Sequence, residues 1–162
     1  NLITPALMKS YPDAESLSKA NPSEVFEYIK SCTYPNNKSK HLVGMAKMVV
    51  KKFMGRIPED PDLLQQLPGV GRKTANVVLG NAFGIAVGVV VDTHVSRLSQ
   101  RMGLTQQKTP EKIEQDLMKL YQQDDWVDLS HILIYHGRKI CTARKPECGL
   151  CPVEKHCPKL FT

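Results

Sequence analysis

The chain has 162 residues, of which 41% are hydrophobic; 22 are basic and 16 acidic, which gives a formal net charge of +6. A chain of this length can bury a core in one or two small domains, and its hydrophobic content excludes general disorder. No apolar stretch has the length of a membrane-spanning helix and no signal-peptide pattern opens the chain, so we expect neither a membrane protein nor a secreted one. The positive charge suits a polyanionic partner, although charge alone is weak evidence.

Helical signals begin near the amino end of the chain and recur along most of its length. Asn21, Pro22 and Glu24 have the order of a helix start, with a cap residue, proline at the first helical position and glutamate at the third, which predicts a helix to about residue 31. Over 38–53, apolar residues recur at spacings of three and four, which predicts a helix with its lysines largely outside the apolar face. That face comprises Leu42, Ala46, Val49, Val50 and Phe53.

Caps and prolines divide the rest of the chain into further helices. Asp60 and Pro61 open a short helix, and a Pro-Gly-Val-Gly run at 68–71 ends it. The β-branched run at 87–91 is the one strand candidate, and because it has no convincing partner we interpret it as a buried connector. The later helices are expected over 72–83, 92–102, 109–121 and 124–138. The predicted fold is all-α, with a compact metal-binding loop that begins at Cys141.

A glycine-rich hairpin, with the sequence L-P-G-V-G-R-K-T-A over 67–75, lies between two predicted helices. Such a hairpin leaves backbone N–H groups pointing outwards at a helix start, where the helix dipole adds partial positive charge, so a phosphate is the natural ligand. Contacts of this kind hold nucleic acid without reading its sequence. On the two glycines alone, a packing hinge between helices is an equally good interpretation. The candidate contacts are Gly69, Val70, Gly71, Arg72 and Thr74.

Lys73 and Asp92 are the candidate catalytic residues. Lys73 lies in the first turn of its predicted helix, where the dipole and the neighbouring Arg72 both favour the neutral amine that a nucleophile needs. A surface lysine that binds phosphate is the alternative. Asp92 follows an apolar run and precedes a helix, which makes it a candidate N-cap. Beside a cleft, the same carboxylate can accept a proton from lysine or stabilise positive charge on a sugar.

Four of the five cysteines lie close together near the carboxyl end. Cys141, Cys148, Cys151 and Cys157 have six, two and five residues between them. Four thiolates in a short loop can bind Zn²⁺ or an iron–sulfur cluster, and sulfur ligation alone does not choose between the two. Disulfides are a third option, against which an intracellular compartment argues. Cys32 stands apart and is expected to be a buried or partly buried thiol.

Positive charge is concentrated in two stretches of the sequence. Residues 36–57 contain six basic side chains and no acid, and residues 138–159 contain six more against Glu147 and Glu154. Either stretch alone suits a solvated face. Because the two flank the hairpin, we interpret them as parts of a surface that faces DNA.

These motifs, in this order, resemble the endonuclease III family of helix–hairpin–helix DNA glycosylases. The resemblance rests on the hairpin with its lysine, V-D-T-H-V-x-R at 91–97, H-G-R-x-x-C at 136–141 and the C-x6-C-x2-C-x5-C spacing, and it extends from about Ser39 to Cys157. It implies a six-helix barrel domain over 1–103, with the helix–hairpin–helix at 61–83, and a small helical cluster domain over 104–162. The cysteine loop at 141–157 would bind a [4Fe–4S] cluster, and the active site would lie in the cleft between the domains.

The resemblance also implies a base-excision repair enzyme, a DNA glycosylase with AP lyase activity that acts on oxidised pyrimidines. Lys73 matches the family's catalytic lysine and Asp92 its catalytic aspartate. The lysine would attack C1′ of a flipped-out nucleotide, and the resulting Schiff base would allow β-elimination. Arg144 and Lys145 lie in the loop that meets the DNA backbone in this family. The implied partner is double-stranded DNA with damaged pyrimidines or abasic sites. We expect a monomer in the bacterial cytoplasm or nucleoid, or in a eukaryotic nucleus.

The chain departs from the family at its amino end. Family members have further helices before the position that matches Asn1, including a glutamine-bearing turn beside the flipped nucleotide, and we expect this part of the barrel to be missing here. If it is, a non-catalytic DNA-binding or redox-sensing iron–sulfur module is one rival. A monofunctional adenine glycosylase is another, although those enzymes typically lack a lysine at position 73. The third rival is a helical interaction domain that a zinc ion stabilises.

Overall fold

The computed structural model describes residues 2–161, in which we find helices and irregular segments and no β-strand. The predicted all-α fold class is confirmed. The chain divides into two compact units, Asn1–Ala75 and Asn76–Thr162, which are described separately below. The division into domains over 1–103 and 104–162 stays a prediction. None of the helices in residues 2–161 combines the length and apolar character that a membrane crossing requires.

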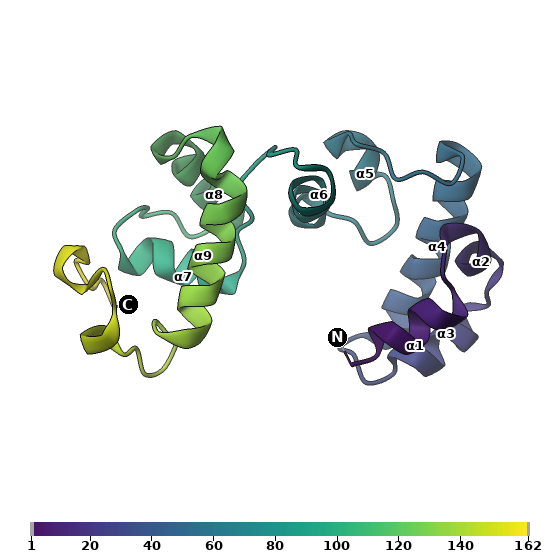
Figure 1. The fold of residues 1–162 in the computed structure, drawn as a ribbon, viewed down its shortest axis with the longest axis horizontal. Coiled ribbons are helices and arrows are strands. Elements are labelled where there is room, and N and C mark those ends of the chain that lie inside the picture. Colours follow the sequence, from purple (N-terminus) through teal and green to yellow (C-terminus); the bar gives the residue numbers. More distant parts are fainter. Residues whose placement is uncertain (1, 162) are drawn as a thin grey trace. The chain divides into compact units, whose positions relative to one another are not determined.

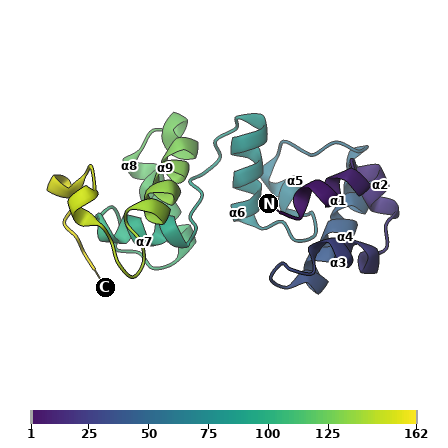
Figure 2. The same cartoon turned by 60° about the horizontal axis from the view of Figure 1, so that its bottom comes forward.

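The first unit is built around one long helix, α4 (Pro35–Phe53), against which two shorter helices pack (Figures 1 and 2). These are α2 (Ala14–Lys19) and α3 (Pro22–Ile29), while α1 (Thr4–Ser10) contacts α3. Capping boxes start α2 at Asp13 and α3 at Asn21, as the sequence predicts for Asn21. The buried core of this part comprises Leu7, Ala20, Val25, Ile29 and Val43.

The apolar face of α4 is rotated relative to the predicted one. Ser39, Val43, Ala46 and Val49 are buried, whereas Leu42, Val50 and Phe53 are only half-buried. The helix also begins three residues before the predicted start, directly after Tyr34, whose φ of 56° lies in the left-handed region. The rotation places the small Ser39 side chain against the core, where its hydroxyl donates to the Asn36 carbonyl. A hydrophobicity pattern does not reveal such a satisfied buried serine.

A short helix, the hairpin and α6 follow α4. Asp60 caps α5 (Pro61–Gln65), and α6 (Arg72–Val78) begins after the hairpin. The predicted helix over 72–83 does extend to Phe83, but its last part, Leu79–Phe83, is a π-helical turn that ends at Gly84, with a φ of +69°. The side chain of Asn81 donates to the Val77 carbonyl at 2.8 Å, which suits this wider turn.

In the second unit, α7 (Thr93–Arg101) packs against α9 (Trp126–Lys139) and contacts α8 (Pro110–Leu120). The connector at 87–91 is not a strand and is held from two sides. The Val90 N–H donates to Ser130 Oγ at 2.9 Å, and Gly88 passes directly over the buried Glu114, whose carboxylate accepts from Asn76 Nδ2 at 2.9 Å. The core comprises Val89, Val91, Val95, Leu98, Ile113, Leu117, Leu129 and Leu133.

Candidate functional site

The hairpin at 67–75 forms as the sequence predicts. Leu67 is buried and accepts a hydrogen bond from the Val70 N–H at 3.1 Å, which closes the turn. Gly69 has a φ of +80°, a conformation that favours glycine. The Gly71 carbonyl accepts from the Ala75 N–H at 3.0 Å and so begins α6. The turn therefore presents its backbone at the start of a helix, the arrangement that suits phosphate.

A histidine from α4 supports the hairpin, and the sequence did not single it out. A Cβ added at Gly69 would lie 2.9 Å from His41 Nδ1 and 3.0 Å from the His41 Cβ, so the ring packs directly on the turn. Pro68 makes a similar contact with Gly44 of the same helix, where an added Cβ would lie 3.4 Å away. The turn is therefore braced by α4, through contacts between residues that are far apart in the sequence.

Lys73 is the second residue of α6, and its side chain is exposed. Ala75, two residues later, is completely buried. The helix is therefore anchored on one side while the lysine lies on its accessible side, in the first turn. The first unit thus brings the amine together with the candidate phosphate contacts, of which Gly69, Gly71, Arg72 and Thr74 are exposed.

Asp92 belongs to the second unit and is the N-cap of α7. Its Oδ1 accepts hydrogen bonds from the backbone N–H groups of His94 at 2.8 Å and Val95 at 2.9 Å. The predicted cap is therefore confirmed. Both hydrogen bonds fall on one carboxylate oxygen, and the side chain is half-buried, so the cap fixes the carboxylate while its edge stays accessible to solvent. The placement of an active site between two domains stays a prediction.

Two arginines of α7 hold the start of the cysteine loop. Arg97 Nη2 donates to the carbonyls of Gly137 at 2.8 Å and Cys141 at 2.9 Å. Gly137 is buried because α7 and α9 pack closely there; an added Cβ would lie 3.0 Å from the His94 Cβ. Arg101, at the end of α7, contacts the loop itself. Arg97 ends the V-D-T-H-V-x-R motif, but local sequence does not reveal what either arginine binds, since their partners lie about 40 residues away in the chain.

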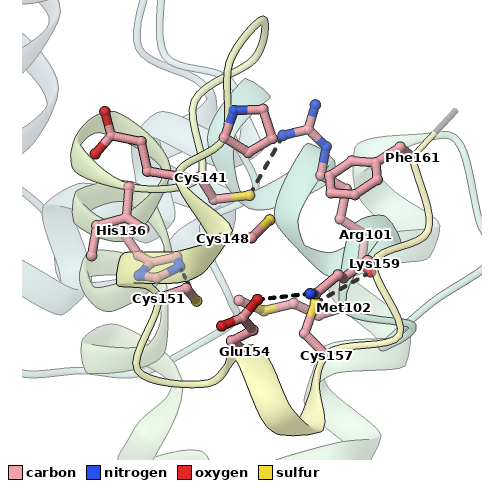
Figure 3. Close-up of a pocket in the computed structure, with 13 residues that line it drawn as sticks. Arg101, Met102, His136, Cys141, Cys148, Cys151, Glu154, Cys157, Lys159 and Phe161 are labelled. Atoms are coloured by element: carbon pink, nitrogen blue, oxygen red, sulfur yellow. Dashed lines mark hydrogen bonds and ion pairs between the residues drawn. The ribbon is translucent and has the colours of Figure 1, made fainter.

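The four clustered cysteines line one cavity, together with Arg101 and His136 (Figure 3). All four are free, half-buried thiols and not disulfides. His136 Nε2 lies 3.4 Å from Cys151 Sγ. Burial lowers the pKa of His136, which favours the neutral imidazole beside this ligand sulfur. Cys32 is also a free, half-buried thiol, as predicted.

The donor set and the cavity fit a polynuclear cluster. The four thiols approach the cavity from different sides, as Figure 3 shows, and cysteine thiolates are the usual ligands of iron–sulfur clusters. A tetrahedral zinc holds its sulfurs about 2.3 Å from one centre. In a four-iron cluster each cysteine binds a different iron, and the sulfurs lie further apart.

Arg144 and Lys145 project from the loop between the first two cysteines, and both are exposed. Thr142 fixes the backbone of this turn, because its Oγ1 donates to the Lys145 carbonyl at 2.6 Å and accepts from the Lys145 N–H at 3.3 Å. Pro146, the next residue, is half-buried and lines the cavity. The turn therefore carries two solvated cations on a fixed backbone.

Two family models match the chain. Residues 1–123 match the HhH-GPD superfamily of base excision DNA repair proteins, and residues 141–157 match the iron–sulfur binding domain of endonuclease III. The second match contains all four clustered cysteines. The two matches therefore account for both the hairpin and the cysteine loop.

Curated relatives and solved structures agree with these models. The chain is 51% identical to endonuclease III of Synechocystis sp. over 158 residues, which cover 98% of the chain and 72% of that protein. It is 39% identical to endonuclease III of Escherichia coli K12, over 96% of the chain and 74% of that protein. A trapped covalent endonuclease III–DNA intermediate matches with a TM-score of 0.92 and 35% identity, over 98% of the chain and 75% of that chain. A non-covalent endonuclease III–DNA complex matches with the same TM-score and identity, over 98% of the chain and 74% of that chain.

Proposed function

The chain belongs to the HhH-GPD superfamily of base-excision DNA repair proteins, as an endonuclease III with an iron–sulfur binding domain, and we propose that Lys73 and Asp92 carry out its reaction. Endonuclease III is a bifunctional DNA glycosylase and AP lyase, and the identity over nearly the whole chain extends that activity to this protein. The assignment of residues to the steps, the lesion and the DNA contacts are proposals.

The observation that carries the proposal is the position of Lys73. Its exposed amine lies in the first turn of α6, two residues after a hairpin that offers backbone N–H groups to a phosphate. A phosphate held there brings the attached deoxyribose close to the amine. The lysine nitrogen uses its lone pair to form a bond to C1′, and the C1′–N bond to the base breaks with its electrons leaving on the base. The base then takes up a proton.

The lyase step follows from the same covalent link. The sugar opens to give an imine between Lys73 and C1′, which makes the C2′ hydrogen acidic. Loss of that proton to a base drives the electrons towards C3′, and the C3′–O bond breaks with the phosphate leaving. The strand is thereby cut 3′ to the lesion, and water later releases the lysine.

Asp92 assists the displacement of the base. Its Oδ1 is engaged by the α7 backbone, so the side chain cannot rotate freely, and Oδ2 is the oxygen that accepts the lysine proton. The carboxylate also stabilises the positive charge that develops on the sugar as the base leaves. A fixed, half-buried carboxylate performs this role better than a mobile one because it needs no reorganisation during the reaction.

The partner is double-stranded DNA that contains an oxidised pyrimidine or an abasic site. Gly69, Val70 and Gly71 contact one phosphate through backbone groups, with Arg72 and Thr74 beside them. Arg144 and Lys145 provide two further phosphate contacts from the cysteine loop. The two solved relatives are complexes of endonuclease III with DNA, which supports this choice of partner. We further propose that the enzyme acts as a monomer, in the cytoplasm or nucleoid of a bacterium or in the nucleus of a eukaryote.

Cys141, Cys148, Cys151 and Cys157 are the residues that hold the [4Fe–4S] cluster. When bound, the cluster supplies a cross-link between segments of the loop that have no hydrophobic core of their own. The chain's own residues then position Arg144 and Lys145 through the turn at Thr142. The cysteine loop is therefore part of the DNA-binding surface.

Base release and strand cleavage on a duplex with a single thymine glycol test the assignment of Lys73. We expect the wild-type protein to release the base and cleave the strand. In Lys73→Gln the rates of both steps should fall by about 10³-fold or more, because one amine serves both steps. Lys19→Gln is the matched control, since it removes a lysine that pairs with Glu15 at 2.8 Å in the first unit. Undiminished cleavage by Lys73→Gln would contradict the proposal.

A further inference from the structure

Arg101, the last residue of α7, contacts both ends of the cysteine loop. Its Nη1 donates to the Thr142 carbonyl at 2.8 Å, and its Nη2 donates to the Ala143 carbonyl at 2.8 Å. These two carbonyls immediately follow the first ligand, Cys141. At the other end of the loop, the guanidinium lies 5.0 Å from the centre of the Phe161 ring (Figure 3). One side chain therefore spans the opening of the loop.

The backbone of Arg101 reinforces this link. Its carbonyl accepts a hydrogen bond from the Leu160 N–H at 2.9 Å, and Cys157 Sγ lies 3.8 Å from the same oxygen. Arg101 therefore attaches two segments of the chain to α7: the segment that follows Cys157 and the segment that follows Cys141. The loop contains only isolated helical turns, so these contacts supply attachment that the loop itself lacks.

The guanidinium also reaches a ligand sulfur. Arg101 Nη1 lies 3.5 Å from Cys141 Sγ, as the dashed line in Figure 3 marks. An arginine stays protonated in proteins. Among residues 2–161, its hydrogen-bond partners on the loop are neutral carbonyls, and no carboxylate pairs with it. By contrast Lys159, which also lines the cavity, pairs with Glu154 at 2.8 Å. Arg101 is therefore a lining cation whose guanidinium directly contacts a ligand sulfur.

We propose that Arg101 is a positioning residue of the iron–sulfur centre, which retains the cluster and raises its reduction potential through the hydrogen bond to Cys141 Sγ and the closure of the loop. The inference rests on the assignment of the four cysteines as cluster ligands. Donors to ligand sulfurs stabilise the negative charge on a cluster, and the more reduced state has the greater negative charge. Loss of Arg101 therefore both loosens the loop and makes the cluster harder to reduce.

Iron release provides the first test. The wild-type protein, Arg101→Gln, Arg101→Lys and Lys155→Gln are prepared without oxygen, and the visible absorbance of the cluster is followed in excess ferrous-iron chelator. We expect Arg101→Gln to lose its cluster about tenfold faster than wild type, or more, because the variant lacks one charged hydrogen bond. Arg101→Lys keeps the charge but cannot make the bidentate hydrogen bonds of a guanidinium. Its rate of cluster loss should therefore lie between those of wild type and Arg101→Gln. Lys155→Gln removes an exposed cation of the same loop and should match wild type.

The reduction potential is the second readout, and a role in packing alone would not move it. We expect a lower potential in Arg101→Gln, and a potential close to that of wild type in Arg101→Lys and Lys155→Gln. Failure of Arg101→Gln to retain any cluster, with unchanged helical content by circular dichroism, would also support the inference. Equal release rates and equal potentials in Arg101→Gln and Lys155→Gln would overturn it. Zinc without iron in the wild-type protein would overturn the cluster assignment itself.

Discussion

Asp92 combines a structural role and a proposed chemical role in one carboxylate, and a single substitution separates them. Asparagine caps helices about as well as aspartate, so Asp92→Asn keeps the hydrogen bonds to the start of α7 while it removes the charge. We expect the free energy of unfolding to change by less than about 0.5 kcal/mol. Base release should slow by about 10²-fold or more, because the proton acceptor is lost.

Single-turnover kinetics on a lesion duplex and thermal unfolding measure the two effects. Asp92→Ala removes the cap as well as the charge, so it should be less stable than Asp92→Asn by about 1 kcal/mol. A base-release rate in Asp92→Asn equal to that of the wild-type protein would assign Asp92 to the helix cap alone.

Individual residues also show where sequence reasoning reaches its limit. The cap roles of Asn21, Asp60 and Asp92 could be predicted because each acts on backbone groups two or three residues away. His41 and Arg101 could not, since their partners lie 28 to 60 positions along the chain and become neighbours only after folding. Family resemblance supplied the expected roles of Lys73 and Asp92, which local chemistry left open.

The hairpin is the element to which we assign backbone contacts with phosphate, and its geometry predicts unequal effects at its two glycines. Gly69 has a positive φ, and a Cβ there would press on the His41 ring at 2.9 Å. We expect Gly69→Ala to reduce the free energy of unfolding by about 1–3 kcal/mol, from backbone strain and the close contact. If the hairpin contacts only phosphate, as proposed, affinity for DNA should fall for every sequence alike.

Gly71→Ala is the control for this prediction in stability measurements. Gly71 has no positive φ, and an added Cβ meets no atom within 4 Å in the described structure. Its unfolding free energy should stay within about 0.5 kcal/mol of wild type. Equal losses of stability in Gly69→Ala and Gly71→Ala, measured by chemical denaturation, would show that the contact with His41 does not constrain the turn.

At the scale of elements, the helix starts with a recognised cap were predicted better than the buried face of α4. Starts carry local caps and prolines, as at Pro61 and Pro110. The face of α4 was misplaced because packing buries Ser39, a residue that hydrophobicity assigns to the surface. The π-helical turn at Leu79–Phe83 was missed since its residues fit an ordinary helix equally well. The buried connector was predicted correctly, from the lack of any pairing strand.

The charge of the whole molecule predicts how DNA binding responds to salt. Each phosphate contact releases counterions, so the logarithm of affinity falls linearly with the logarithm of salt concentration. If Arg144 and Lys145 each contact a phosphate, Arg144→Gln and Lys145→Gln should each reduce the magnitude of that slope by about 0.9. Lys19→Gln should leave the slope unchanged, because Glu15 already neutralises this lysine.

Fluorescence anisotropy with an undamaged duplex, measured between low and moderate salt, gives these slopes directly. Slopes for Arg144→Gln and Lys145→Gln that equal the slope of Lys19→Gln would exclude the cysteine loop from the DNA interface. The hairpin would then be the remaining candidate for the phosphate contacts.

The central claim is that Lys73 forms a covalent bond to the deoxyribose of the lesion. Borohydride reduces an imine to a stable amine, so it traps the enzyme on its substrate at the Schiff-base stage. With a duplex that contains one abasic site, the wild-type protein should give a protein–DNA adduct, and peptide mass analysis should place the DNA on Lys73. Lys73→Gln should give no adduct, while Lys19→Gln should give as much as wild type. An adduct that persists in Lys73→Gln, or that maps to another residue, would contradict this account.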